Sequence, residues 1–590
     1  MRPLKEIRIL PGLFTVKTDR GSVARWKSGD KVRFHNSLPQ KLGGWVKNSV
    51  NAFLGKCRAL MGWRSIVGTQ YMGFGTHLKL YAWSGGTFYN ITPLSSSGTY
   101  ANNPITTTIS SALVSIAHTA HGRLAGDYLT ISGATAVGGI TISGEYAVTS
   151  VTSVDAFVIT HSSAATSSAT GGGASVAYSY EIPIGAENDS SFVTGWGGGT
   201  WGAGTWGTAR TTTNTTRLWS FDLWGEDLIA NYRGGGIYAW DTSAGTGTRA
   251  AAISGAPSTA KLIMTSQENK HLIAFGAHSG TTDDPLLIRW STSEDYTSWT
   301  ASSVNSAGSK RLQTGNEIMC AVKTRKEILV FTDSHLWTMV FVGPPYTFNF
   351  EPIGSNGAII SQNAAQEANG VVYWMGEEDF FYYDGGINTL PCDVWPTVFE
   401  DINDAHESLI VSGYNREYSE IWWFYPASGS TENDRYVIYS TTEKTWSAGT
   451  LARTAYLGNT TGIVHDTYAA GTDGYLYNHE SGTSNDGTPF TSTLESYDFE
   501  IGEGDYVGQV GMFVPDFKEL TGGVTVTLKA RKFPHSAQTS DTSIAVTSST
   551  EYVNPRIKGR QLAIEVESTG ASDHWVMGTN RIGVRPHGKR

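Results

Sequence analysis

The chain has little charge. Only 16% of its 590 residues are Asp, Glu, Lys or Arg, whereas a globular protein usually has about 25%. So low a charge density excludes a disordered chain and a charged coiled coil, because both depend on many ionised side chains.

Cysteine is also scarce. The three cysteines, Cys57, Cys320 and Cys392, lie far apart in the sequence. No pair has the spacing of a metal or redox site, and an odd count argues against a disulfide framework. We therefore expect three buried free thiols in a chain made in a reducing compartment.

Long apolar runs are missing. None reaches the roughly 18 residues of a membrane-spanning helix, so no membrane span is expected. Pro3, Glu6 and Pro11 interrupt the N-terminus where a signal peptide has a continuous apolar core. The chain is expected to be cytosolic when it is made.

Catalytic motifs are not evident. No Gly-rich phosphate loop precedes a helix, and neither HExxH nor GxSxG occurs. His118 and His121 are expected to be ordinary polar residues on a strand or turn. The adjacent acids of 377–379 sit on one turn, whereas glycoside hydrolysis needs two carboxylates facing across a pocket. We therefore expect no enzyme activity, no metal and no cofactor.

Glycine and aromatic residues are abundant. The chain has 68 Gly, 19 Trp, 27 Tyr and 22 Phe, with long Ser/Thr runs. Glycine frees tight turns, and aromatic residues and Thr suit a pleated, half-buried surface. This composition predicts an all-β protein.

A similar β unit recurs along the chain. Each copy has an apolar run, a polar turn and a second, often aromatic run; the copies span 59–94, 218–241, 320–341, 369–386, 408–447 and 465–482. Starts about 40–60 residues apart, with about four strands each, are typical of β-propeller blades. We predict a propeller of six or seven blades.

The segment 293–299 is similar to the Asp box of sialidase-like propellers, a turn-stabilising motif that lies away from the active site in that family.

Two regions depart from the blade pattern. Residues 105–181 are nearly free of charge and alternate strictly, which predicts a small β-barrel or sandwich inserted into a loop. From about 497 to 590, four alternating strands predict a separate β-sandwich with a basic tail. The predicted organisation is an extended segment at 1–57, a first blade at 58–104, the insertion at 105–181, the remaining blades at 182–496, and the sandwich at 497–590.

The charges are unevenly distributed. Residues 1–60 hold 13 Lys/Arg and 3 Asp/Glu, and residues 556–590 hold 7 and 3, whereas residues 61–555 hold 23 and 47. Basic ends can bind nucleic acid or an acidic surface of another copy or partner. Chance clustering on solvated loops remains the alternative.

Three tryptophans, Trp196, Trp201 and Trp206, recur every five residues in a Gly-rich stretch. A packed loop that closes the propeller accounts for this pattern. The alternative is an aromatic contact with a partner or a neighbouring subunit.

The first 50 residues carry a long motif. It runs through Pro11-Gly12, Arg25-Trp26, Val32-Arg33-Phe34, Leu38-Pro39 and Gly43-Gly44-Trp45. This motif resembles the N-terminus of the tail hub or nozzle proteins of short-tailed bacteriophages, and the likeness continues through most of the chain outside 105–181.

The resemblance implies a structural virion protein. It implies a homohexameric ring below the head-to-tail adaptor, in the virion tail assembled in the bacterial cytoplasm, which passes genomic DNA and anchors fibres or spikes. The acidic body favours a lumen that is acidic or neutral, because a basic bore would hold DNA tightly. The alternatives are a propeller-fold virion glycosidase or depolymerase and a carbohydrate-binding propeller.

The N-terminal segment has too many basic and aromatic residues for a terminal tail that has no binding role. We expect a neighbouring subunit or the adaptor to hold Arg20, Arg25, Trp26, Arg33 and Trp45. On this interpretation, a chain without residues 1–57 keeps a folded propeller and fails to join tails.

Overall fold

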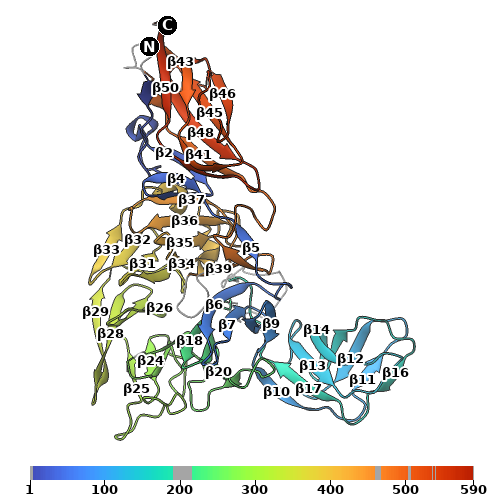
Figure 1. Cartoon of the computed structure of the whole chain (residues 1–590). Helices are drawn as coiled ribbons and strands as arrows, with labels where there is room; N and C mark the ends of the chain where they lie inside the picture. Colours follow the sequence, from blue (N-terminus) through green and yellow to red (C-terminus); the bar gives the residue numbers. More distant parts are fainter. Residues whose placement is uncertain are drawn as a thin grey trace, which may run out of the picture. The chain divides into compact units, whose positions relative to one another are not determined.

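The structure is a computed structural model, and it is almost entirely β (Figure 1). It describes residues 4–189, 215–266, 268–355, 357–458, 467–501, 506–533, 536–538 and 540–588. The chain divides into two compact units, with unit 1 formed by 1–52 and 312–590 and unit 2 by 53–311. No described helix is long and apolar enough to cross a membrane.

Unit 2 contains three four-stranded antiparallel sheets, each a simple meander in chain order. Their strands are β6 (Cys57–Arg64), β7 (Gln70–Thr76), β8 (Leu80–Ser84) and β9 (Thr87–Asn90); β18 (Trp219–Trp224), β19 (Asp227–Tyr232), β20 (Ile237–Trp240) and β21 (Ala251–Ala252); and β22 (Leu262–Thr265), β23 (Leu272–Phe275), β24 (Leu287–Trp290) and β25 (Gly308–Arg311).

Unit 1 contains three more meanders and one composite sheet. The meanders are β26 (Ile318–Lys323), β27 (Ile328–Thr332), β28 (Leu336–Gly343) and β29 (Thr347–Gly354); β30 (Ala365–Ala368), β31 (Val371–Met375), β32 (Phe380–Tyr383) and β33 (Ile387–Leu390); and β34 (Val411–Asn415), β35 (Glu420–Tyr425), β36 (Arg435–Ser440) and β37 (Trp446–Thr450). The composite sheet joins β38 (Ala455–Leu457), β39 (Thr467–Ala470) and β40 (Leu476–His479) to β5 (Trp45–Lys47). The short helices η1 (Asp19–Ser22), α1 (Trp395–Phe399) and η2 (Asp404–Leu409) lie between strands.

These sheets have the burial pattern of propeller blades. All six residues of β35 are buried, and its adjacent Trp422 and Trp423 point to opposite faces because side chains alternate along a strand. Trp423 packs in a core with Phe380 and Trp446, whereas Trp422 packs in another with Tyr456. A sheet covered on both faces by neighbouring sheets is what a blade requires. The all-β class, with a β-propeller core, an inserted β-module and a C-terminal sandwich, is therefore confirmed.

The insertion is one curled eight-stranded sheet with its own apolar core. Its strand order is β10 (Leu94–Thr99), β17 (Ala177–Glu181), β13 (Tyr128–Ser132), β14 (Gly144–Ser153), β15 (Ala156–Thr160), β12 (Leu113–Ala117), β11 (Ile105–Thr107) and β16 (Ala169–Gly171). The long β14 pairs with β13 in its first half and with β15 in its second, so it carries the sheet around the core. Because β10 pairs with β17, the module begins at Leu94, which corrects the predicted boundary at 105.

An ion cluster fastens the insertion to the neighbouring blades. Lys79 is 1% exposed and lies 2.8 Å from a Glu145 oxygen and 2.9 Å from Glu181, both in the insertion. Arg249 reaches the other oxygen of Glu181 at 2.8 Å. Two blades, through Lys79 and Arg249, thus share the buried carboxylate of Glu181 in the insertion.

We expect Lys79→Met to loosen this attachment, because it leaves Glu181 buried with one cation fewer. Breaking a buried pair costs about 3–5 kcal/mol. Limited proteolysis should therefore cut the insertion faster in this variant than in the unaltered chain. Lys310→Met removes an exposed lysine of the same unit and should leave the rate unchanged. Equal rates for all three chains would contradict the role of Lys79.

The C-terminal module is built from both ends of the chain (Figure 1). One sheet orders β1 (Leu4–Glu6), β50 (Arg581–Gly588), β43 (Val507–Val514) and β47 (Ile557–Gly559); a second orders β2 (Trp26–Asp30), β41 (Ser492–Ser496), β48 (Gln561–Ser568), β45 (Val524–Arg531) and β46 (Ser540–Val546), with β42 (Phe499–Glu500) beside β48; a third orders β3 (Val32–His35), β4 (Leu38–Lys41), β49 (His574–Met577) and β44 (Phe517–Thr521). The predicted boundary at 497 is wrong because β41 already begins at Ser492, and the separate segment 1–57 is wrong because β1 to β4 complete this module.

Candidate assembly site

Residues 4–47, which we call the N-terminal strap, connect the C-terminal module to the blades of unit 1. Four of its strands join the C-terminal module, and the fifth, β5, pairs with β40 as the outer strand of the composite blade. Between β1 and β2, the Leu13 amide donates to the backbone carbonyl of Trp446 at 2.9 Å. The Thr15 amide donates to the backbone carbonyl of Asp393 at 2.7 Å. The strap is thus hydrogen-bonded to both structures that it connects.

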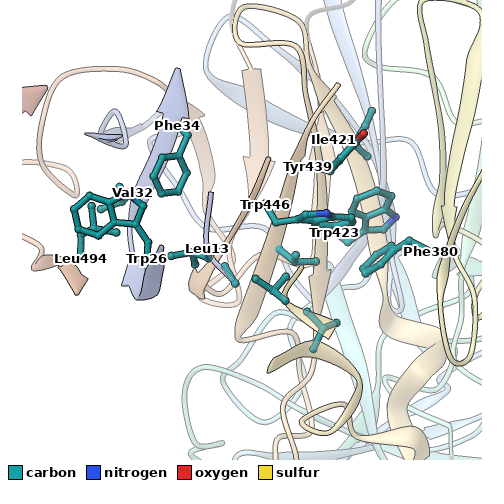
Figure 2. Close-up of a cluster of buried hydrophobic side chains, with 14 of the residues drawn as sticks. Leu13, Trp26, Val32, Phe34, Phe380, Ile421, Trp423, Tyr439, Trp446 and Leu494 are labelled. Carbon is teal, nitrogen blue, oxygen red and sulfur yellow. The ribbon is translucent and has the colours of Figure 1, made fainter. Parts of the chain in front are cut away.

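Apolar side chains follow the same path. Figure 2 shows Leu13 between Trp26, on the side of the C-terminal module, and Trp446, on the side of the blades. Trp26 is 2% exposed and lies in one core with Leu494 and Phe34. Unit 1 therefore has a continuous apolar core through the strap.

The Gly43-Gly44-Trp45 part of the motif has a steric reason. A Cβ on Gly43 would lie 2.9 Å from the Cα of Glu480, and one on Gly44 would meet the backbone nitrogen of Thr483 at 2.9 Å. Only glycine permits this approach. Trp45 then stacks on Phe490 with ring centroids 4.7 Å apart, and its indole N–H donates to Asn485 Oδ1 at 2.6 Å.

A buried ion cluster lies beside this turn. Arg33, on β3, is 1% exposed; its Nε lies 3.0 Å from Glu420 Oε1, and its Nη1 donates to Glu480 Oε2 at 2.9 Å. Its Nη2 also contacts Glu480, and its guanidinium carbon lies 3.6 Å from the Tyr418 ring centroid. Trp422 donates to the second oxygen of Glu420 at 3.1 Å. One arginine therefore holds carboxylates from two blades.

Burial and charge oppose each other in this cluster. Burial by itself lowers the pKa of Arg33, but Glu420 and Glu480 raise it more, so the net direction is upward. Burial raises the pKa of Glu420 to about 7, although the Arg33 charge lowers it. Two buried carboxylates thus depend on one cation. Removal of Arg33 should therefore destabilise this cluster more than removal of either carboxylate.

The predicted site residues separate into three groups. Trp26, Arg33 and Trp45 are buried in their own chain, which corrects the expectation that a neighbouring subunit or the adaptor holds them. Arg25 is half-buried, with its guanidinium carbon 5.0 Å from the Phe14 ring centroid. The side chain of Arg20 and the whole of Trp196, Trp201 and Trp206 lie outside the described residues.

Both basic ends of the sequence meet in one sheet. β1 pairs with β50, and β43 lies between β50 and β47, with Gln509 opposite both Arg585 and Lys558. Lys558 Nζ lies 2.8 Å from His587 Nε2. We call the exposed residues Arg556, Lys558, Arg581, Arg585 and His587 the basic face. The sequence shows the charge at each end but contains no signal that the two ends pair.

Exposed apolar side chains also occur along the strap and just after it. Large side chains are solvent-exposed at Leu4, Leu10, Val16, Val23, Val46 and Val50, the last at 82%. Single exposed apolar side chains are normal on a protein surface. The strap thus has a buried part that builds the fold and a solvent-exposed part that includes these side chains.

The other sequence candidates have structural explanations. His118 Nδ1 lies 2.7 Å from the Tyr180 hydroxyl and His121 Nε2 lies 3.0 Å from the Ser153 carbonyl. In the Asp box, Asp295 Oδ1 accepts from the Thr297 amide and hydroxyl, as a turn-stabilising role predicts. No group of three metal-ligating side chains occurs within the described ranges.

Comparisons with known proteins complete the description. No protein-family model matches the chain, and no curated protein matches it. Among the solved structures that align with it are the designed protein Ika8 (8% identity, 73% of this chain and 98% of that one, TM-score 0.33), PorZ of the Porphyromonas gingivalis type-IX secretion system (9%, 94% and 86%, 0.29) and the endosialidase of phage phi92 (12%, 81% and 69%, 0.20). At TM-scores this low, the alignments carry no functional argument.

Proposed function

We propose that this chain is a non-enzymatic structural subunit of the tail of a short-tailed bacteriophage. In this proposal six copies form a ring below the head-to-tail adaptor, pass the genomic DNA and anchor fibres or spikes. The observation that carries it is the strap, because the motif that resembles nozzle proteins coincides with the residues that join the C-terminal module to the blades. A subunit that bears mechanical load during ejection needs such a joint.

The charge distribution supports the assembly part of the proposal. The basic face lies in the sheet where β1 pairs with β50 and takes its charge from residues 556–587, whereas residues 61–555 carry 47 acidic against 23 basic residues. Opposite charges on two parts of one chain favour head-to-tail contact between copies, and such contacts close into rings. The exposed apolar side chains along the strap supply area for the same contact.

We expect the purified full chain to form a particle with the mass of six 63.6 kDa subunits, measured by light scattering after gel filtration. Reversing two charges of the basic face, with Lys558→Glu and Arg585→Glu together, should weaken assembly by at least about tenfold, since close charge pairs across interfaces contribute this much or more. Raising the salt concentration should weaken the unaltered ring in the same direction.

The matched control reverses Lys310 and Lys326, two exposed lysines outside the basic face. It changes the net charge equally and should leave the ring intact. A monomer at all salt concentrations, or equal assembly of both double variants, would contradict the proposal. Tight binding of duplex DNA by the ring at physiological salt would contradict the expected acidic or neutral lumen.

A further inference from the structure

The hairpin formed by β28 and β29 is longer than the strand beside it (Figure 1). Each of its two strands has eight residues, whereas β27 has five. β27 begins at Ile328, which lies opposite Met339, so residues 340–349 of the hairpin extend past the end of β27. At about 3.3 Å per residue, the part of β28 beyond Met339 is about 13 Å long. We call residues 340–349 the arm.

The arm has an aromatic pair at its middle and an apolar tip. Phe341 and Phe348 lie opposite each other on the two strands, with ring centroids 5.7 Å apart in an edge-to-face arrangement. The exposed residues of the tip between them are Val342, Pro344, Pro345 and Tyr346. Tyr346 is 77% exposed. These side chains follow one another on a single turn, and a contiguous exposed apolar patch marks a contact with a protein or a membrane.

Positive charge lies at the same end of the sheet as the tip. In an antiparallel meander the first and third turns share one end, so the turn 324–327 lies beside the base of the arm. It presents Arg325 and Lys326, which are both exposed. Glu327 in this turn accepts a hydrogen bond from the Tyr383 hydroxyl at 2.8 Å, and the arm itself contains no charged residue. An uncharged apolar tip thus projects past a pair of exposed cations.

This combination fits a lipid surface better than an added protein strand. The outer strand β29 carries Glu351 and Pro352 next to the arm, and a charge and a proline on an edge strand oppose pairing with a further strand. The two prolines of the tip have no N–H to donate to such a strand. Tyrosine is instead typical of the interface between membrane and water. Lysine and arginine close to a membrane are attracted by anionic headgroups.

We propose that the arm binds the surface of a membrane that contains anionic phospholipids. Val342, Tyr346 and the two prolines enter the interfacial layer, and Arg325 and Lys326 contact lipid phosphates. The headgroup layer supplies hydrogen-bond partners for the backbone of the arm beyond β27, which the hydrocarbon core does not. This binding goes beyond the proposed ring, because it uses neither the basic face nor the strap, and either proposal can fail without the other.

The test is flotation of the full chain with vesicles of phosphatidylcholine and phosphatidylglycerol, and with vesicles of phosphatidylcholine alone. We expect tighter binding to the anionic vesicles. Val342→Ser and Tyr346→Ser together should weaken this binding at least about tenfold, because burial of an apolar side chain contributes about this factor. Arg325→Gln and Lys326→Gln together should weaken it at least about fivefold, since each cation near an anionic surface contributes about this factor.

Matched controls change exposed residues elsewhere in the chain: Val304→Ser with Tyr552→Ser, and Lys310→Gln with Lys532→Gln. Both should bind the anionic vesicles as the unaltered chain does. All the replaced residues are exposed, so the unfolding midpoint of every variant should match that of the unaltered chain.

Three results would overturn the proposal. The first is that the unaltered chain does not bind the anionic vesicles. The second is equal binding by the tip variant and the unaltered chain, which would assign the lipid contact to the basic face. The third is a tip variant that keeps its vesicle binding but forms a smaller particle in gel filtration, which would assign the arm to a contact between copies of the chain.

Discussion

Deleting residues 1–52 should unfold unit 1, and not merely prevent assembly. The deletion removes β1, β2, β3 and β4 from the three sheets of the C-terminal module and β5 from the composite blade. It also removes Trp26, whose burial alone is worth about 3–5 kcal/mol, a large part of the 5–15 kcal/mol by which a domain is stable. Calorimetry should show that the main unfolding transition of unit 1 is lost, and near-ultraviolet circular dichroism should show weaker aromatic signals.

A deletion of residues 1–6 provides the control. It removes only β1, an edge strand whose three residues are all exposed, so the transition should move by no more than a few degrees. Adding a separately made fragment of residues 1–52 should restore the larger deletion, because its strands have defined pairing partners. A truncated chain that keeps both the transition and the aromatic signal would show that the strap is an independent assembly element after all.

The alternation of side chains made much of the fold predictable. In 524–531 every second residue is buried, as the sandwich prediction required, and the aromatic hairpins of the predicted units match strands of blades. The sheet from β22 to β25 had no predicted unit. Its strands have four residues each and are separated by polar loops as long as 291–307, so neither length nor periodicity marks them as one blade.

The sequence could locate the strap, but it could not show which residues the strap contacts. The motif marked Arg33 and Trp26 as unusual, yet their partners are distant: Arg33 and Glu480 lie 447 residues apart. A single sequence does not show which distant acidic residue forms an ion pair with a given arginine. Glu420 precedes an apolar aromatic run, and a carboxylate at the start of a fully buried strand is the one local signal that could have identified it.

Arg33→Met should cause the largest loss of stability of any single substitution considered. The methionine fills part of the space, but Glu420 and Glu480 remain in the interior without their shared cation. Breaking a buried pair costs about 3–5 kcal/mol, and for a unit as large as unit 1 we expect the unfolding midpoint to fall by roughly 4–7 °C. Arg416→Gln, at an exposed position in the turn after β34, is the matched control and should leave the midpoint unchanged.

The pH dependence separates this mechanism from a simple packing defect. Burial already raises the pKa of Glu420 to about 7 against the opposing charge of Arg33, so without Arg33 it should rise further. A carboxyl group whose pKa is higher in the folded than in the unfolded state stabilises the fold at low pH and loses that contribution as the pH rises. The unaltered chain loses this contribution only up to about pH 7, whereas the variant continues to lose it above that pH, so the midpoint deficit of Arg33→Met should widen as the pH rises above about 7. Replacing both acids as well, with Glu420→Gln and Glu480→Gln, should recover most of the deficit at the higher pH, because no uncompensated charge is then buried. A deficit that is independent of pH and unchanged in the triple variant would mean that Arg33 acts through its packing on Tyr418, and not through the two carboxylates.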